Sequence, residues 1–447
     1  MSSVYEKYSP SGIEWLPLIP SDWETVRLRW LATIYSGGTP DKKNESYWTG
    51  GTVPWLNSGA VNQQLVTEPS TYITEEALEN SSAKWVPEDA LVIALAGQGK
   101  TKGMVAQLAF NATCNQSMAA IIPDSKLKAR FLYWWLTSNY QNIRNLAGGD
   151  LRDGLNLQLL GKIGCPIPSR QEQKAISSFL DVETSKIDGL VSEQRRLIEL
   201  LKEKRQAVIS HAVTKGLNPN APMKPSGIQW LGEVPKHWEV KRLRHVGQVQ
   251  NGLNIGGEAF GSGDPFVSYG DVYKNVNVPE VPSGLVQSSP EDKAKCSLEA
   301  GDVLFTRTSE TVEDIGVAST CLCSIPRSTF AGFLIRLRPD DGILSPQYST
   351  YLFRNQGVQE HFSGTMNMVT RASLSQDVLK MLPICIPPLR EQQEIAEFIT
   401  EKVDLFHSLI GEVERGIELL QERRTALISA AVTGKIDVRE FAYQETA

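Results

Sequence analysis

The chain has 447 residues, of which 41% are hydrophobic and 21% charged, and its formal net charge is −6. This length exceeds one ordinary core, so we expect a soluble globular protein with two or more domains. The longest apolar runs, such as ALVIALAG at 90–97, are too short to span a membrane, and the polar stretch MSSVYEKYSP has no apolar core of the kind expected in a signal peptide. Net acidity disfavours a general coat protein for nucleic acid. It still permits a DNA reader, because DNA contacts depend on local basic clusters.

Residues that carry chemistry form no recognisable catalytic or metal-binding pattern. The six cysteines are scattered, and only Cys321 and Cys323 lie close together, without metal-ligand spacing. We therefore expect free, buried thiols and a cytoplasmic protein. Neither HExxH nor paired CxxC occurs, and the five histidines have no nucleophile constellation near them in the sequence. These observations predict that the chain has no catalytic residue and no metal site.

The chain repeats itself, beginning with a Trp-containing segment. SGIEWLPLIPSDWETVRLR at 11–29 and SGIQWLGEVPKHWEVKRLR at 226–244, here named the Trp segments, share eleven of nineteen positions. ELLKEKRQAVISHAVT at 199–214 and ELLQERRTALISAAVT at 418–433 share eleven of sixteen. The repeat predicts two copies of one unit of about 215 residues. Each copy has a Trp segment, whose tryptophans we expect to pack against a helix end, then a variable segment, then a long charged helix.

The two variable segments resemble each other only faintly. VPWLNSGAV at 53–61 resembles DPFVSYGDV at 264–272, and EDALVIAL at 88–95 resembles GDVLFTRT at 301–308. Both segments alternate short β-like runs with turns rich in Gly and Asn, and each has one helix-like piece, at 131–146 and 347–362. This pattern predicts two mixed α/β domains.

The first variable segment contains ALAGQGKT at 94–101, which is close to a phosphate-binding loop with Ala94 in place of the first Gly. The aligned segment of the second copy, RTSETVED at 307–314, has no Gly-Lys-Thr. A loop that the copies do not share is better suited to specificity or to structure than to nucleotide binding. A P-loop ATPase using residues 94–101 nevertheless stays open as an alternative function.

Two long helices are predicted. One begins at SRQEQ, where Ser169 and Glu172 can form a capping box, and the other follows Pro387 and Pro388. Gly216 and Gly434 stand where the helices should end. Apolar residues recur at spacings of three and four, which is typical of a coiled-coil seam: Ile176, Phe179, Leu180, Ile187, Leu190, Val191, Leu197, Ile198, Leu201 and Val208, then Ile395, Phe398, Ile399, Val403, Phe406, Leu409, Ile410, Val413, Ile417, Leu420 and Leu427.

These elements predict an α+β fold with internal duplication, in which two mixed α/β domains are joined by two long antiparallel coiled-coil helices. We expect the first Trp segment and variable domain in residues 1–166 and the first helix in 167–217. A linker, the second Trp segment and the second variable domain should occupy 218–385, and the second helix with the C-terminal tail 386–447.

The sequence resembles the specificity subunit of Type I restriction–modification enzymes. The resemblance rests on the Trp segments, the IPxxxEQ start of each helix (167–173 and 386–392), HAVTKGL at 211–217 and AAVTGKIDVRE at 430–440. GGTPDKKNESYWTGGTVPW at 37–55 also looks like the opening of a target recognition domain, whereas NGLNIGGEAFGSGDPF at 251–266 departs from that opening.

The resemblance implies that each variable domain is a target recognition domain that reads one half of a split, asymmetric site in double-stranded DNA. The helices would space the domains and dock two modification subunits, which carry S-adenosylmethionine and methylate adenine at N6. Restriction subunits would add translocation and cleavage that depend on ATP and Mg²⁺. This chain would be non-catalytic and hold no cofactor. A coiled-coil scaffold that binds proteins and no DNA is the second alternative.

Polar loop residues are the predicted DNA contacts, because Asn and Gln pair with adenine and Arg and Lys with guanine or phosphate. In the first domain these are Lys42, Lys43, Asn57, Gln98, Lys100, Lys102 and Asn115. In the second they are Asn251, Asn254, Tyr269, Arg307, Thr308 and Arg371. Four charged helix residues are the predicted contacts with partner subunits, with capping as the alternative for the two glutamates: Glu172, Arg205, Glu391 and Arg424.

Overall fold

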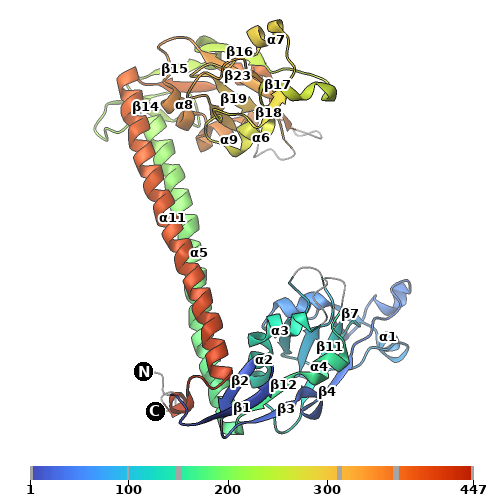
Figure 1. The fold of residues 1–447 in the computed structure, drawn as a ribbon. Helices are drawn as coiled ribbons and strands as arrows, with labels where there is room; N and C mark the ends of the chain where they lie inside the picture. The colour runs from blue at the N-terminus through green and yellow to red at the C-terminus, as the bar shows by residue number, and fades with distance from the viewer. Residues whose placement is uncertain (1–3, 98–99, 147–153, 310–314, 366–371, 444–447) are drawn as a thin grey trace. The chain divides into compact units, whose positions relative to one another are not determined.

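The structure is a computed structural model that describes residues 4–97, 100–146, 154–309, 315–365 and 372–443. The chain divides into two compact units, Met1–Gln194 with Arg415–Ala447 and Arg195–Glu414. Each unit contains one Trp segment, one variable domain and a part of both long helices (Figure 1). The duplication seen in the sequence is therefore also present in the fold.

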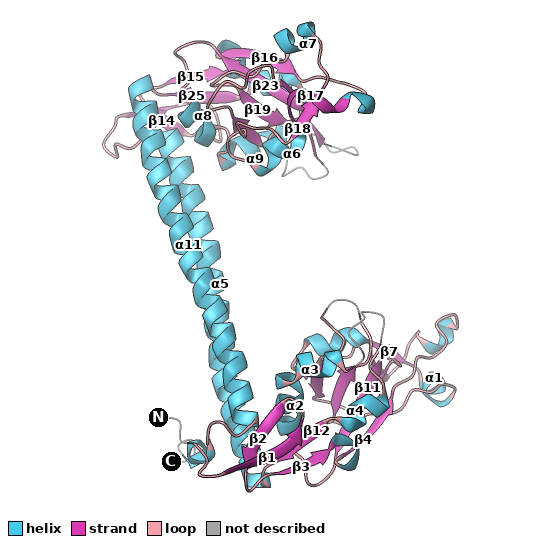
Figure 2. Cartoon of the chain, in the orientation of Figure 1, coloured by secondary structure: helices cyan, strands magenta, loops and turns pink. Residues whose placement is uncertain are grey.

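Both predicted long helices are present. They are α5 (Arg170–Lys215) and α11 (Leu389–Val432), coloured cyan in Figure 2. The backbone of Gly216 and of Gly434 has φ of 76° and 69°, a conformation that terminates a helix and favours glycine. The capping box is also confirmed, because Ser169 N donates to Glu172 Oε2 at 3.0 Å and Glu172 N donates to Ser169 Oγ at 3.3 Å.

Within each unit the two helices run antiparallel. In the first unit, Leu180 of α5 and Ile428 of α11 lie in one buried cluster. Asp188, two turns after Leu180, pairs with Arg424, one turn before Ile428, so the two helices run in opposite directions. In the second unit, Ala212 and Ile395 share a buried cluster. The predicted seam is partly wrong, because three of its leucines are 51%, 40% and 36% exposed: Leu190, Leu197 and Leu409. The apolar stripe is wider than the contact between two helices can cover.

The first variable domain contains two sheets. Its five-stranded sheet has the order β4 (Ala32–Ser36), β11 (Met118–Pro123), β8 (Leu91–Ala94), β9 (Val105–Leu108), β6 (Leu65–Val66). Its three-stranded sheet has the order β10 (Thr113–Cys114), β5 (Val53–Leu56), β7 (Thr71–Ile73). Among the described residues of this domain, four helices accompany the sheets: α1 (Glu75–Glu79), α2 (Ala129–Ser138), α3 (Tyr140–Asn145) and α4 (Leu157–Lys162).

The second variable domain repeats this plan. Its four-stranded sheet has the order β16 (Gly247–Asn251), β23 (Leu334–Pro339), β19 (Val303–Thr306), β21 (Ala318–Thr320), and its three-stranded sheet β18 (Gly284–Val286), β17 (Phe260–Val267), β22 (Thr329–Phe330). A short pair, β20 (Thr308–Ser309) and β24 (Ala372–Ser373), lies beside them. The helices are α6 (Tyr269–Lys274), α7 (Pro290–Lys295), α8 (Pro346–Leu352), α9 (Gln356–Thr365) and α10 (Gln376–Met381).

The strand pairing aligns the two domains residue by residue. Trp55 and Phe266 pair with Thr113 and Thr329 of the equivalent strands, as the resemblance between 53–61 and 264–272 predicts. The second predicted alignment is wrong by one residue. Ala94 pairs with Met118, and Thr306 pairs with Leu334, so Asp89 corresponds to Gly301 and not to Asp302. Both Asp89 and Gly301 have positive φ, so the turn geometry fixes the alignment, whereas the sequence comparison matched two Asp side chains.

The Trp segments connect each variable domain to a helix end. They form β1 (Tyr8–Ile13), β2 (Leu16–Pro20) and β3 (Glu24–Arg27) in the first copy, and β14 (Glu233–Pro235) and β15 (Glu239–Arg242) in the second. β14 pairs with β13 (Met223–Pro225), β3 with β12 (Gly164–Ile167), and β15 with β25 (Pro383–Ile386). Trp23 and Trp238 are buried, and each packs against the glycine that ends a long helix, Gly434 or Gly216. The predicted role of these tryptophans is therefore confirmed.

Candidate nucleic-acid interface

In the first domain, four loops meet where β4 and β8 end and β11 begins. We name residues 37–40, 95–104, 115–117 and 154–156 the first four-loop edge; residues 98 and 99 lie outside the described part of the chain. Backbone hydrogen bonds tie the loops together: Gly37 N to Met118 O (3.2 Å), Gly38 N to Cys114 O (2.8 Å), Leu95 N to Ser117 O (2.8 Å) and Leu155 N to Leu95 O (2.8 Å). The edge is therefore fixed by the main chain.

The second domain builds the same edge. The second four-loop edge comprises residues 252–256, 307–309 with 315–317, 331–333 and 372–375. Its loops are tied by four equivalent bonds: Gly252 N to Leu334 O (3.1 Å), Leu253 N to Phe330 O (2.8 Å), Arg307 N to Phe333 O (2.8 Å) and Leu374 N to Arg307 O (2.7 Å). A Cβ atom on Gly37 or Gly252 would collide with backbone oxygens of the next loop, so glycine is required at both positions.

The two edges share a backbone but carry different side chains. The strand registers show which residues of the two edges occupy equivalent positions. Thr39 is equivalent to Asn254, Leu95 to Arg307, Gln116 to Gly332 and Ser117 to Phe333. In the first edge the Thr39 hydroxyl donates to Gln116 Oε1. In the second, the missing side chain of Gly332 lets Asn254 Oδ1 lie against its Cα. Such an arrangement can present two different sets of donors, acceptors and apolar groups to two different surfaces.

The predicted contact residues of the first domain differ in exposure. Lys42, Lys43 and Lys100 are exposed, whereas Lys102 is only 4% exposed and offers less surface to a phosphate. Asn57 Oδ1 accepts from Gly59 N at 2.8 Å and caps the 3₁₀ helix η3 (Ser58–Asn62). Asn115 Oδ1 accepts from Ser117 N at 3.1 Å inside the first edge. Gln98 lies outside the described residues.

In the second domain, Asn254, Arg307 and Thr308 belong to the second four-loop edge, and Arg371 lies outside the described residues. The side-chain oxygen of Asn251 is buried and has no hydrogen-bond partner within the described part of the chain. Tyr269 is the first residue of α6, outside the four loops of the edge, and it stacks on Tyr273 with ring centroids 5.9 Å apart.

Sequence reasoning missed Thr39, Gln116 and Phe333. Thr39 follows a strand, and Gln116 and Phe333 precede one. The sequences of these strands differ between the two copies, so only the pairing of the strands in the structure shows which residues are equivalent. The sequence held one signal for this edge: Gly37 and Gly252 are equivalent glycines, and each stands two residues before an edge residue, Thr39 or Asn254. Sequence spacing alone could not show that the loop at 115–117 lies against the loop at 37–40.

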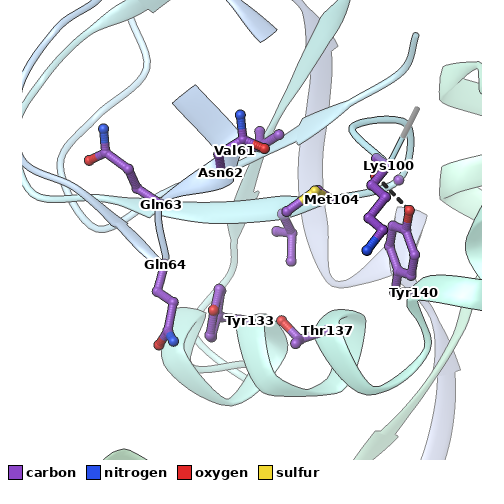
Figure 3. Close-up of a pocket in the computed structure, with 11 residues that line it drawn as sticks. Val61, Asn62, Gln63, Gln64, Lys100, Met104, Tyr133, Thr137 and Tyr140 are labelled. Carbon is purple, nitrogen blue, oxygen red and sulfur yellow. Dashed lines mark hydrogen bonds between the residues drawn. The ribbon is translucent and has the colours of Figure 1, made fainter. Parts of the chain in front are cut away.

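A cavity of about 230 Å³ adjoins the first edge (Figure 3). It is lined by residues of η3, of the loop after β8 and of α2 and α3, among them Gln63, Lys100, Tyr133 and Tyr140. The hydroxyl of Tyr140 donates to the backbone oxygen of Lys100 at 2.5 Å, which holds the described part of this loop against α3. Most of the lining is apolar, so the cavity suits no polyphosphate.

The loop at 94–101 also lacks the structural context of a P-loop. A P-loop leads from a strand into a helix whose N-terminal N–H groups face the phosphates. Here residues 100–104 form a turn, and the next element is β9, which pairs antiparallel with β8 through Val92 and Ala106. Within the described residues, no cluster of three or more His, Cys, Asp or Glu side chains suits a metal ion.

The four charged residues predicted to contact partner subunits have partners within their own units. Glu172 Oε1 accepts from Tyr5 Oη and Trp23 Nε1, both at 3.3 Å. Glu391 pairs with His237 at 2.8 Å, and Arg205 contacts His407 at 3.0 Å. Arg424 binds both carboxylate oxygens of Asp188, at 2.8 and 3.2 Å. The two long helices also carry seven exposed leucines: Leu190, Leu197, Leu200, Leu389, Leu405, Leu409 and Leu419.

A fully buried glutamine stands at the start of each helix. The amide of Gln173 donates to Lys126 O and Pro168 O, at 3.0 and 2.9 Å, and its oxygen accepts from Lys128 N at 2.7 Å. Gln392 makes the same three bonds, to Ile343 O and Pro387 O and from Ser345 N. Each glutamine thereby fixes its variable domain on the helix that follows.

The comparison with known families agrees with this duplicated architecture. Residues 20–200 and 235–417 each match the family described as Type I restriction modification DNA specificity domain. The chain belongs to this family.

The chain is similar to curated specificity subunits over all or part of its length. The Type I restriction enzyme EcoKI specificity subunit of Escherichia coli (strain K12) is 22% identical over 432 residues, which are 94% of this chain and 90% of that protein. The EcoR124I/EcoR124II specificity subunit of Escherichia coli is 30% identical over 183 residues, 40% of this chain and 45% of that protein.

Solved structures share the fold. A chain from a type I R-M system, solved to explain complex assembly and conformational transition, has a TM-score of 0.72 at 16% identity and covers 94% of this chain and 99% of its own length. The HsdS subunit of Thermoanaerobacter tengcongensis has a TM-score of 0.55 at 16% identity, with coverage of 94% and 98%. No helix in the described part of this specificity subunit is long and apolar enough to cross a membrane.

Proposed function

We propose that this chain recognises a split, asymmetric site in double-stranded DNA and that each four-loop edge reads one half-site. One observation carries the proposal: the two edges have four equivalent backbone hydrogen bonds, but the side chains at equivalent positions differ. A shared backbone supports the same mode of docking in both domains. Different side chains support the recognition of two different base sequences, because base edges in the major groove are distinguished by donor, acceptor and methyl patterns.

A DNA-reading domain also needs side chains that contact the phosphate backbone, and lysines near the first edge can supply them. Lys42, Lys43 and Lys100 are exposed. Contacts from such side chains to phosphates fix the position of a protein on the duplex without reading sequence, and they make binding sensitive to salt. The net charge of −6 does not oppose this, because the field at the binding surface depends on the local charges.

We further propose that α5 and α11 dock two modification subunits and set the spacing of the half-sites. The exposed leucines support this docking, because apolar side chains on a helix that is already paired favour the addition of further helices. The modification subunits would carry S-adenosylmethionine for adenine-N6 methylation, and restriction subunits would supply the ATP- and Mg²⁺-dependent steps. This chain would contribute recognition and assembly and no catalytic group. The same architecture could serve a protein scaffold, but the differing edges have no role in that function.

A domain exchange tests the proposal. Residues 30–160 are replaced by the corresponding domain of another specificity subunit whose site is known, and the adenines methylated by the assembled complex are mapped. We expect one half-site to change to that of the donor while the other stays. If both half-sites changed, or if methylation were independent of sequence, the two-reader proposal would be wrong.

A further inference from the structure

We propose that Arg307 and Phe333 form a base-reading pair in the second domain, in which Arg307 binds a guanine and Phe333 contacts the methyl group of a nearby thymine. This inference rests on the proposed function and names the chemistry that the second half-site must contain. It starts from Phe333, whose side chain is 62% exposed at the tip of a three-residue loop between β22 and β23. Its neighbours Ala331 and Gly332 are buried.

The fold does not need these two side chains. The bond from Arg307 N to Phe333 O is 2.8 Å long, and the first domain makes the equivalent bond at 2.8 Å between Leu95 and Ser117. The first edge therefore has the same backbone without an arginine or a phenylalanine there. The ring of Phe333 therefore lies largely in solvent, and its position in the edge beside Arg307 is what makes it a candidate contact.

The backbone bond also places the two side chains at a suitable spacing. Chain segments joined by such bonds lie about 4.8 Å apart, and base pairs of B-DNA rise by about 3.4 Å. The two side chains can therefore reach the same base pair or neighbouring ones. Arginine donates bidentately to guanine O6 and N7, and phenylalanine packs against the thymine methyl group. Asn254, which lies against Gly332, adds an amide beside them.

The alternatives make different demands. A ring inserted between base steps would bend the duplex and would not depend on a thymine methyl group. A ring that docks on a protein would affect assembly with the modification subunits instead of DNA binding. Both alternatives therefore give results that differ from those expected here.

The experiment uses the chain assembled with its modification subunits and a duplex that carries the mapped split site. Each thymine of the second half-site is replaced in turn by deoxyuridine, which removes only the methyl group, and each guanine by 7-deazaguanine, which removes N7. Kd is measured at one fixed salt concentration. For the wild-type chain, one deoxyuridine should weaken binding by about four-fold, and one 7-deazaguanine by at least about five-fold.

The variants adopt the residues of the first edge, so that the backbone has a known precedent. Phe333→Ser should abolish the difference between thymine and deoxyuridine and leave the guanine effect unchanged. Arg307→Leu should abolish the effect of 7-deazaguanine. Val281→Ser is the matched control, because Val281 is an exposed apolar residue of the same domain outside the edge. It should change neither difference.

The result distinguishes the inference from the proposed function. If the complex bound no split site at all, the proposed function would fail. Only the inference would fail if the complex bound a split site whose second half lacked a guanine with a thymine close to it. The same holds if the Phe333→Ser complex still distinguished thymine from deoxyuridine. Loss of the modification subunits from the Phe333→Ser complex would assign the ring to a protein contact and would also overturn it.

Discussion

The side-chain oxygen of Gln173 accepts a hydrogen bond from the backbone N–H of Lys128 at 2.7 Å. One residue of α5 thus holds the chain that leads into α2. Gln392 of α11 holds Ser345, before α8, in the same way at 2.8 Å. The link is encoded by the EQ pair that both copies share at the start of each long helix.

Replacing either glutamine by alanine should destabilise its own unit. Gln173→Ala leaves one N–H and two carbonyl groups without their partner, and the loss is expected to be about 1–3 kcal/mol in the free energy of unfolding. Urea denaturation of the full chain measures it. Gln171→Ala and Gln393→Ala are the controls, because both side chains are exposed on the same helical turns, and they should change stability by less than about 0.5 kcal/mol. Equal effects of the buried and exposed substitutions would contradict the assigned role.

Serine at two aligned leucines should weaken assembly without unfolding the chain. Leu200 and Leu419 occupy equivalent positions of the two helices and are both exposed. We expect Leu200→Ser with Leu419→Ser to reduce the amount of modification subunit that co-purifies, while thermal unfolding of the isolated chain stays unchanged. Glu203→Ser, an exposed polar position one turn away from Leu200, provides the control. Normal assembly of the double variant would exclude these leucines as the docking surface.

Lysine 100 should have no role in nucleotide binding. Because the loop leads into strand β9, we expect no heat of binding when ATP with Mg²⁺ is titrated into the purified chain. Lys100→Ala should instead weaken the binding of the assembled complex to DNA and reduce the salt dependence by about one phosphate contact. ATP affinity that disappears in Lys100→Ala would revive the P-loop alternative.

Thiol reactivity should separate one cysteine from the other five. Burial raises the pKa of Cys114, Cys165 and Cys385 to about 12, so at pH 8 only about one thiol in ten thousand is ionised at each. Burial also raises the pKa of Cys296 and of Cys321. Desolvation raises the pKa of Cys323 as well, but Cys323 is half-buried whereas the other five cysteines are buried. A disulfide reagent at pH 8 should therefore label one site quickly, Cys323→Ser should remove that fast phase, and denaturant should release the remainder. Several fast sites in the folded chain would contradict the buried positions.

The sequence predicted the elements that depend on local patterns. The capping box at Ser169, the helix ends at Gly216 and Gly434, and the burial of Trp23 and Trp238 all follow from short motifs that occur twice. The residues of the two four-loop edges were harder to predict from the sequence, because they come from four loops that only the folded sheet brings together. The one-residue error at Asp89 shows why. A turn that needs positive φ accepts Asp or Gly, so side-chain similarity alone misplaces the register.

Residue type alone did not show which contacts the charged helix residues make within the chain. Arg424, a predicted contact with a partner subunit, also pairs with Asp188 of the facing helix at 2.8 Å. The seam pattern could not separate leucines that face the other helix from those that face outward, because spacings of three and four cover more than one side of a helix.

One chain should read two half-sites with two separate edges, and a map of methylated adenines tests this most directly. The map is made in cells that produce the modification subunits, with and without this chain. Methylation should require the chain and should occur at one asymmetric motif, in which two short defined sequences are separated by a fixed number of undefined bases. A single continuous motif, or methylation that does not change when the chain is removed, would contradict it.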